Sequence, residues 1–252
     1  MSDTMLRVLG WRALLIHGDP CVLDRWLWLR RHLRGGNLRT FDAGCGNGGF
    51  SIYAARTGNQ VLAASFSEHE RDGVRRRSEE LGVSGIEFRT LDLRELEEHR
   101  VSLGQFDQVI CCETIEHVND DERLVRSLAA MLSPGGRLLL TAPHDGHRPL
   151  YSEEPNPSQV EDGSHVRYGY SPQRLRQIAH DAGLEVESED FISGVVSQKV
   201  TDLMRRLTGL LGRPAAWLAI LPLRALVIVD RPLSRLLGYP YLSVGLSAVK
   251  RA

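Results

Sequence analysis

The residues best suited to chemistry lie in one short run at positions 112–117. If this run forms a helical turn, the side chains of Glu113, Glu116 and His117 share one face, because positions three and four apart are neighbours on a helix. Two carboxylates and an imidazole can hold a divalent cation such as Mg²⁺ or Mn²⁺ and leave positions open for substrate oxygens. The imidazole could instead act alone as a general base. We therefore predict catalytic roles for Glu116 and His117.

A glycine-rich turn at residues 44–49 is the second candidate site. It directly follows the expected strand at residues 38–43, which ends in Asp42 and Ala43, and opens a helix. Glycines remove Cβ atoms, so a ligand can lie against the backbone, and a helix that starts there presents free N–H groups to an anion. The spacing of Gly44, Gly46 and Gly49 also fits a dinucleotide fingerprint. The turn predicts a cofactor site, and a tight turn without a ligand is the alternative.

Alternating strands and helices are expected to position these two runs. Repeated β–α units predict a parallel, doubly wound sheet, which binds ligands at the carboxyl ends of its strands. The sequence thus predicts a Rossmann-like α/β fold. The expected strands are residues 38–43, 60–65, 85–90, 106–112, 136–142, 184–191 and 241–249, and the main expected helices are residues 67–82, 120–132 and 171–183.

Three segments depart from this alternation. Residues 1–36 are expected to form an N-terminal helical cap, in which Asp19 is the N-cap of a helix that begins at Pro20. Residues 195–239 predict a helical insertion before the last strand of a domain that spans residues 37–252. The apolar positions and arginines of the insertion allow a lid, a membrane contact or a dimer interface. Residues 143–170 are a candidate wall of the active site.

The order of these features resembles the class I S-adenosylmethionine-dependent methyltransferases over residues 37–194 and the last strand. Asp42 before the glycines, Asp92 after the third strand and the turn at residues 133–136 follow the order of that family. The resemblance implies a seven-stranded sheet with helices on both faces and S-adenosylmethionine as cofactor, with Asp92 accepting a hydrogen bond from the adenine. The implied cofactor-binding residues are Asp42, Gly44, Cys45, Gly46, Gly48, Ser65, Asp92, Leu93 and Cys112.

The second strand departs from the family pattern. The family ends this strand with a carboxylate that holds both ribose hydroxyls, whereas this chain has Ser65 there. A serine makes fewer and weaker hydrogen bonds than a carboxylate. We expect either that Ser65 or Glu68 substitutes or that the cofactor binds more weakly. The same absence argues against a nicotinamide-dependent dehydrogenase, which also needs a carboxylate for the ribose.

The run at residues 112–117 resembles the metal site of ubiquinone-biosynthesis and small-RNA 2′-O-methyltransferases. The latter take a further histidine from beyond the fifth strand, which implies His165 here. Metal-free relatives carry a similar glutamate–histidine pair, so a reaction without metal stays open. His144, just past the fifth strand, is a third catalytic candidate beside His117 and Glu116. The implied ligands of Mg²⁺ or Mn²⁺ are Glu113, Glu116, His117 and His165.

Composition and charge restrict the partners. The 252 residues contain 31 Lys and Arg against 32 Asp and Glu, so no overall positive field attracts a nucleic acid. The four cysteines form no C-x-x-C pair, the N-terminus has no signal sequence, and the apolar residues 215–229 are too short to cross a bilayer. We expect a cytoplasmic protein, with peripheral membrane contact through residues 195–239 as an alternative. The sequence does not indicate the oligomeric state.

The activity that these features predict is methyl transfer from S-adenosylmethionine to a hydroxyl group. The expected acceptor is a small molecule, a sugar or a lipid-linked intermediate, and a divalent metal is an optional assistant. Methylation of nitrogen or carbon, which needs no metal, is the alternative among enzymes. A non-catalytic protein that binds S-adenosylmethionine is the alternative from another class, and the serine at position 65 favours it.

Overall fold

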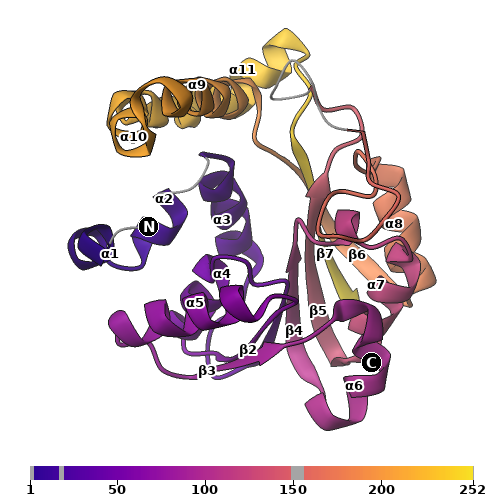
Figure 1. Ribbon diagram of the computed structural model, residues 1–252. Coiled ribbons are helices and arrows are strands. Elements are labelled where there is room, and N and C mark those ends of the chain that lie inside the picture. Colours follow the sequence, from indigo (N-terminus) through magenta and orange to yellow (C-terminus); the bar gives the residue numbers. More distant parts are fainter. Residues whose placement is uncertain (1–2, 17–19, 149–155, 252) are drawn as a thin grey trace.

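A seven-stranded sheet with the strand order β3-β2-β1-β4-β5-β7-β6 forms the centre of the computed structural model, which describes residues 3–16, 20–148 and 156–251 (Figure 1). Helices cover both faces of this sheet. The predicted seven-stranded α/β fold is confirmed. The strands are β1 (Arg39–Ala43), β2 (Gln60–Ser65), β3 (Ile86–Thr90), β4 (Phe106–Cys112), β5 (Leu132–Pro143), β6 (Leu184–Ile192) and β7 (Ser243–Lys250).

Strand β7 is antiparallel to both of its neighbours, β5 and β6, whereas β1 to β5 are parallel to one another. The repeated β–α units predicted parallel strands. The last strand differs because the helical insertion leaves the carboxyl end of β6 and returns at that same edge, so the chain re-enters the sheet in the opposite direction. The carboxyl ends of β1, β4, β5 and β6 therefore lie along one edge.

Two apolar layers join the helices to the sheet. On one face, Phe41, Val109 and Leu140 belong to a cluster with the helices α6, α7 and α8. On the other face, Ile110 and Leu139 belong to a cluster with α3 (Pro20–His32) and α4. Both faces are covered, so the central strands are largely buried, and apolar residues on them are accompanied by buried polar ones such as Thr40, Gln108 and Thr141. The helices between the first six strands are α4 (Gly49–Arg56), α5 (Glu68–Glu80), α6 (Leu96–Leu103), α7 (Asp121–Ala130) and α8 (Pro172–Asp181).

The N-terminal segment and the insertion are both helical. Helix α3 begins at Pro20 as predicted, while Asp19 and residues 149–155 lie outside the described residues. The ring of Trp28 packs so closely on Gly245 of β7 that a Cβ there would lie 2.7 Å from it. The cap consists of α1 (Asp3–Leu9), α2 (Arg12–Ile16) and α3 (Pro20–His32), and the insertion of α9 (Val195–Leu211), α10 (Arg213–Ile220), the 3₁₀ helix η3 (Pro222–Val229) and α11 (Asp230–Leu237).

Candidate active site

The glycine-rich turn joins β1 to α4, and its glycines serve different purposes. Gly44, Gly46 and Gly48 all have φ between 49° and 91°. A Cβ on Gly44 would lie 2.5 Å from Oγ1 of Thr114, and one on Gly48 would lie 2.3 Å from Val74. A Cβ on Gly46 would meet nothing within 4 Å. Gly46 therefore keeps space open, whereas Gly44 and Gly48 allow neighbouring elements to approach.

Asp42 lies beneath this turn and is almost completely buried. Its carboxylate accepts a hydrogen bond of 2.5 Å from Oγ of Ser51 in α4. Burial raises the pKa of Asp42 to about 6. Cys45 is also buried and Cys112 is half-buried, and burial raises the pKa of each thiol. These three predicted cofactor residues therefore do not line the cavity in front of the turn.

A cavity of about 390 Å³ opens in front of the turn, at the carboxyl edge of the sheet. Of the predicted site residues, Gly44, Gly46, Ser65, Asp92, Leu93, Glu113 and His117 line it. Glu70, Arg94, Thr114 and Glu161 also line it, and the sequence did not single them out. Asp42, Cys45, Gly48, Cys112, Glu116, His144 and His165 are not among its lining residues.

Ser65 at the end of β2 is paired with a carboxylate from the next helix. Its Oγ donates a hydrogen bond of 2.6 Å to Glu70 and accepts one from the backbone N–H of Ser67. Glu68, the predicted substitute, has an exposed side chain that pairs with Arg71 at 3.8 Å. The carboxylate beside the second strand therefore comes from Glu70. The serine-to-glutamate spacing at residues 67–70, which indicates a capping box, was the available signal.

Asp92 follows β3 and is the N-cap of the 3₁₀ helix η1 (Leu93–Glu95). Arg94 donates hydrogen bonds of 2.5 to 3.0 Å to both carboxylate oxygens of Asp92. These bonds lower the pKa of Asp92. Arg94 also donates a hydrogen bond of 3.0 Å to Glu161 and lies 5.6 Å from the ring centre of Phe66. Arg94 thus connects the predicted adenine-binding carboxylate to the loop after β5.

Glu113 was predicted to be a metal ligand, but the structure does not place it in the cluster of Glu116, His117 and His165. The prediction assumed a helical turn over residues 113–117, but Glu113 has φ of 51° and only residues 115–117 form a 3₁₀ turn, η2 (Ile115–His117). The Glu113 carboxylate accepts hydrogen bonds from Thr141 and Ser243, and Arg25 of α3 lies 3.5 Å away. Glu113 therefore faces β5, β7 and the cap.

Glu116 lies on η2 and is 1% exposed. Neither of its carboxylate oxygens has a hydrogen-bond partner among the described residues. Burial, together with the Glu113 carboxylate, raises the pKa of Glu116 well above its usual range. A buried carboxyl group without hydrogen bonds is costly. The Glu116 carboxyl group therefore has to be either protonated or neutralised by a cation, because no hydrogen bond from a described residue stabilises its charge.

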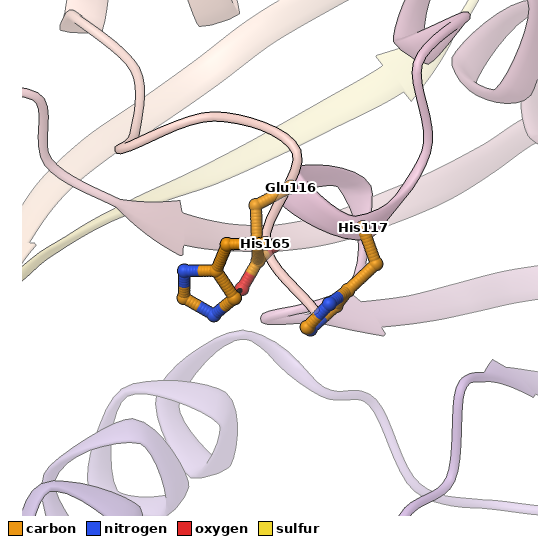
Figure 2. Close-up of side chains that lie close together, drawn as sticks. All are labelled: Glu116, His117 and His165. Carbon is orange, nitrogen blue, oxygen red and sulfur yellow. Dashed lines mark ion pairs between the residues drawn. The ribbon is translucent and has the colours of Figure 1, made fainter. Parts of the chain in front are cut away.

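The two histidines beside Glu116 come from different segments, as Figure 2 shows. Ligand atoms of Glu116, His117 and His165 all lie within 4.8 Å of one another. Nε2 of His165 is 4.0 Å from Oε1 of Glu116. Nδ1 of His117 lies 3.1 Å from the carbonyl oxygen of Ser164, and because a carbonyl can only accept, Nδ1 of the neutral ring carries the hydrogen. The lone pair of Nε2 is then available.

Residues 156–170 form a loop that is anchored on η2. The N–H of Val166 donates to the carbonyl oxygen of Glu116, and the hydroxyl of Tyr170 donates to that of Ile115. Arg167 forms an ion pair with Asp121 of α7. These contacts bring His165 to the site. Part of the predicted active-site wall at residues 143–170 is thus present, and residues 149–155 lie outside the described residues.

His144 does not line the cavity. Its Nδ1 accepts a hydrogen bond from the N–H of Gly146, and its ring contacts the ring of Phe191 edge to face. Burial lowers the pKa of this imidazole. These contacts point to packing, so the geometry gives no support to the predicted catalytic role of His144.

A comparison with known protein families identifies the class of the chain. Residues 23–189 match the methyltransferase domain family, so the chain belongs to that family. The sheet order, the glycine-rich turn and the cavity in front of it are those of a class I S-adenosylmethionine-dependent methyltransferase. No helix of the described residues is long and apolar enough to cross a membrane.

Similar proteins include two ubiquinone biosynthesis O-methyltransferases. The chain is 30% identical to the enzyme of Acinetobacter baylyi over 115 residues, and the match covers 45% of this chain and 48% of that enzyme. It is 34% identical to the enzyme of Xanthomonas axonopodis pv. citri over 114 residues, and the match covers 45% of this chain and 46% of that enzyme. The chain thus spans about half the length of these relatives. Coclaurine N-methyltransferase, solved with N-methylheliamine and SAH, shares the fold at a TM-score of 0.61 and 15% identity, over 94% of this chain and 80% of that one.

Proposed function

We propose that this protein transfers a methyl group from S-adenosylmethionine to a hydroxyl group of a small-molecule, sugar or lipid-linked acceptor. The cofactor would lie in the cavity along Gly44 and Gly46, with Asp92 toward the adenine. The similarity to ubiquinone biosynthesis O-methyltransferases supports oxygen as the acceptor atom. N- or C-methylation is the remaining alternative within the class, and a non-catalytic cofactor-binding protein is the alternative outside it.

Glu70 takes the role of the missing carboxylate at the second strand in this proposal. Ser65 fixes one carboxylate oxygen of Glu70 at 2.6 Å, and both residues line the cavity. A carboxylate accepts hydrogen bonds from hydroxyls more strongly than a serine does. Glu70, held by Ser65, would therefore accept hydrogen bonds from the ribose hydroxyls of the cofactor.

The observation that carries the acceptor chemistry is the buried carboxyl group of Glu116, which lies beside two imidazoles and has no hydrogen-bond partner among the described residues. One carboxylate and two imidazole nitrogens fit a divalent cation, and carboxylate oxygen is a ligand typical of Mn²⁺ and Mg²⁺. Glu116, His117 and His165 would hold such an ion, without the predicted Glu113. When bound, the cation would lower the pKa of the acceptor hydroxyl.

His117 also suits a reaction without metal. Its Nδ1–H faces the Ser164 carbonyl, so Nε2 can accept the proton of the acceptor hydroxyl. The hydroxyl oxygen then forms a bond to the methyl carbon, and the carbon–sulfur bond breaks with its electron pair left on sulfur. The products are the methylated acceptor, S-adenosylhomocysteine and a protonated base. Much of the rate must come from holding the oxygen in line with that bond.

A test separates the acceptor classes. The chain would be incubated with S-adenosylmethionine and a catechol, an aliphatic alcohol or a primary amine, and formation of S-adenosylhomocysteine would be measured. We expect turnover with a hydroxylated acceptor. Turnover with the amine alone would favour N-methylation. Saturable binding of S-adenosylhomocysteine by calorimetry, with no turnover on any acceptor class, would favour the non-catalytic alternative.

A further inference from the structure

We propose that one end of the molecule, formed by residues 3–16 and 20–36 of the cap together with the insertion at residues 195–239, binds the surface of a bilayer that contains anionic lipid. We call these residues the basic end. Figure 1 shows the helices of both segments on the same side of the sheet, with α9 above α3. Sγ of Cys21 in α3 lies 3.5 Å from Oγ1 of Thr201 in α9, so the two segments are in contact.

The charge of the chain is unevenly distributed. Residues 195–239 contain seven Lys and Arg against two Asp and Glu, and residues 3–16 and 20–36 together contain six against two. The basic end therefore carries a net charge of +9, although the whole chain carries −1. The remaining 176 residues must carry −10. Basic segments next to a membrane are attracted to anionic lipid headgroups, whereas the acidic remainder would be repelled by them.

Large apolar side chains are exposed mainly on the same end. Of the seventeen large apolar side chains that are exposed among the described residues, ten lie in the insertion and two in the cap. Leu210, Ile228 and Leu236 are each about 80% exposed or more, at 79%, 87% and 82%. Scattered single apolar residues are ordinary on a surface, but such a concentration marks a binding site.

Basic and apolar residues alternate within one stripe of α9. Lys199, Leu203, Arg206 and Leu210 are all exposed and follow one another at intervals of four, three and four residues. These intervals place the four side chains on one face of the helix. A helix of this kind rests on a bilayer with its apolar groups among the acyl chains and its cations at the headgroups.

The cap and the adjoining α4 add aromatic rings with arginines beside them. Trp11, Trp26 and Tyr53 are in mutual ring contact, with centroids 5.5 to 5.7 Å apart. The guanidinium of Arg12 lies 5.7 Å from the Trp11 ring centre, and that of Arg30 lies 5.6 Å from the Trp26 ring centre. All three rings are half-buried, and the indole nitrogen of Trp26 is buried, so their outer edges and the two exposed arginines are the parts that can meet a headgroup layer, where tryptophan and tyrosine are enriched.

The basic end and the cavity share the carboxyl edge of the sheet. The insertion leaves this edge after Ile192 of β6 and returns to it at Ser243 of β7. Glu113, which lines the cavity, accepts a hydrogen bond from Ser243 and lies 3.5 Å from Arg25 of the cap. A protein bound through its basic end would hold the cavity near the bilayer. Insofar as it rests on the proposed function, this geometry favours a lipid-linked acceptor.

The test measures co-sedimentation with vesicles and needs no methyl transfer. The wild-type chain is mixed with vesicles of phosphatidylcholine alone or of phosphatidylcholine with phosphatidylglycerol. We expect binding to the anionic vesicles that weakens as salt is added. The variant R30Q/R206Q/R235Q should bind roughly a hundredfold more weakly, at about fivefold per arginine. The control R75Q/R76Q/R89Q removes the same charge from exposed positions outside the basic end and should bind as the wild type does.

A second variant tests the apolar part. L210Q/I228Q/L236Q should lose binding at high salt, whereas V101Q, at a 92% exposed valine of α6, should not. Absence of binding to anionic vesicles, or equal loss in both arginine variants, would overturn the proposal. A wild-type dimer in light scattering that L210Q/I228Q/L236Q converts to a monomer would also overturn it, because the face would then join two copies. Calorimetry with S-adenosylhomocysteine tests the cofactor site separately.

Discussion

The cavity and the Glu116 cluster beside it are built in different ways. The lining of the cavity comes largely from the stretch between β1 and η1, where the glycine-rich turn at residues 44–49 directly follows a strand. The cluster brings Glu116 on η2 together with His165, which lies 49 positions later on a separate loop, and neither residue lines the cavity. Short-range motifs therefore indicate the first region, whereas tertiary contacts decide the second.

Replacement of Glu116 by Gln should have the largest effect. Because Glu116 would act on the acceptor and does not line the cofactor cavity, we expect turnover to fall about 100-fold to 10,000-fold. Affinity for S-adenosylhomocysteine by calorimetry should stay within about twofold. The control Glu97→Gln, at an exposed position of α6, should leave both unchanged. Equal turnover in E116Q and wild type would remove Glu116 from the mechanism.

The pH dependence of stability should depend on Asp42. Its pKa is about 6 in the folded protein against an ordinary value of 3.8, so the folded state binds the proton more tightly. The free energy of unfolding should therefore fall as pH rises from about 4 to about 6, by at most about 3 kcal/mol from this group. Asp42→Asn should remove that part of the slope in urea denaturation. Burial also raises the pKa of Asp24 to about 6, so this residue contributes a similar slope. The variant D24N should therefore reduce the pH dependence of the free energy of unfolding independently of D42N.

Two alanine substitutions should distinguish the glycines of the turn. Gly48→Ala should lower the free energy of unfolding by about 1–3 kcal/mol, because the new Cβ would lie 2.3 Å from Val74 and φ is 82°. Gly46→Ala should cost less stability, because its Cβ would enter open space, but it should weaken binding of S-adenosylhomocysteine. Thermal denaturation and calorimetry measure the two effects. The reverse pattern would contradict the different roles assigned to the two glycines.

The smallest effect concerns the ribose site. Glu70→Gln should weaken binding of S-adenosylhomocysteine about tenfold, or about 1.4 kcal/mol, which is the lower end of the range for a hydrogen bond to a charged group. Glu68→Gln, on the same helix, should have no effect, because its side chain is exposed and outside the cavity lining. The double variant S65D/E70Q should recover affinity by returning the carboxylate to the end of β2. If E68Q weakened binding more than E70Q does, Glu68 would be the residue that replaces the ribose-binding carboxylate, as the sequence allowed.

The fold could be predicted from the sequence because each strand and most helices carry local signals. The capping residues Ser67 and Asp120, for example, accept the hydrogen bonds expected at the starts of α5 and α7. The direction of β7 could not be predicted in this way, because it depends on the edge at which the insertion returns. Helices α1 and α2 were not predicted individually, since short helices depend on tertiary packing.

The site was less predictable where the backbone departs from regular structure. The positive φ of Glu113 turns its side chain toward Ser243 and Arg25, and no residue spacing indicates such a turn for a glutamate. His165 was found only by resemblance, because its approach to Glu116 depends on bonds such as that from Val166 to the Glu116 carbonyl. Glu70 was missed in favour of Glu68, because the direction of a side chain at a helix start depends on its partner, Ser65.

Titration of the protein with Mn²⁺, followed by calorimetry, tests the acceptor site most directly. Wild type should bind about one Mn²⁺ per chain, as expected for a single cluster of one carboxylate and two imidazoles. E116Q should lose this binding, and E113Q should retain it, because Glu113 faces the cap and β7. No saturable Mn²⁺ binding by wild type, or loss of binding in E113Q but not in E116Q, would contradict the proposed metal site.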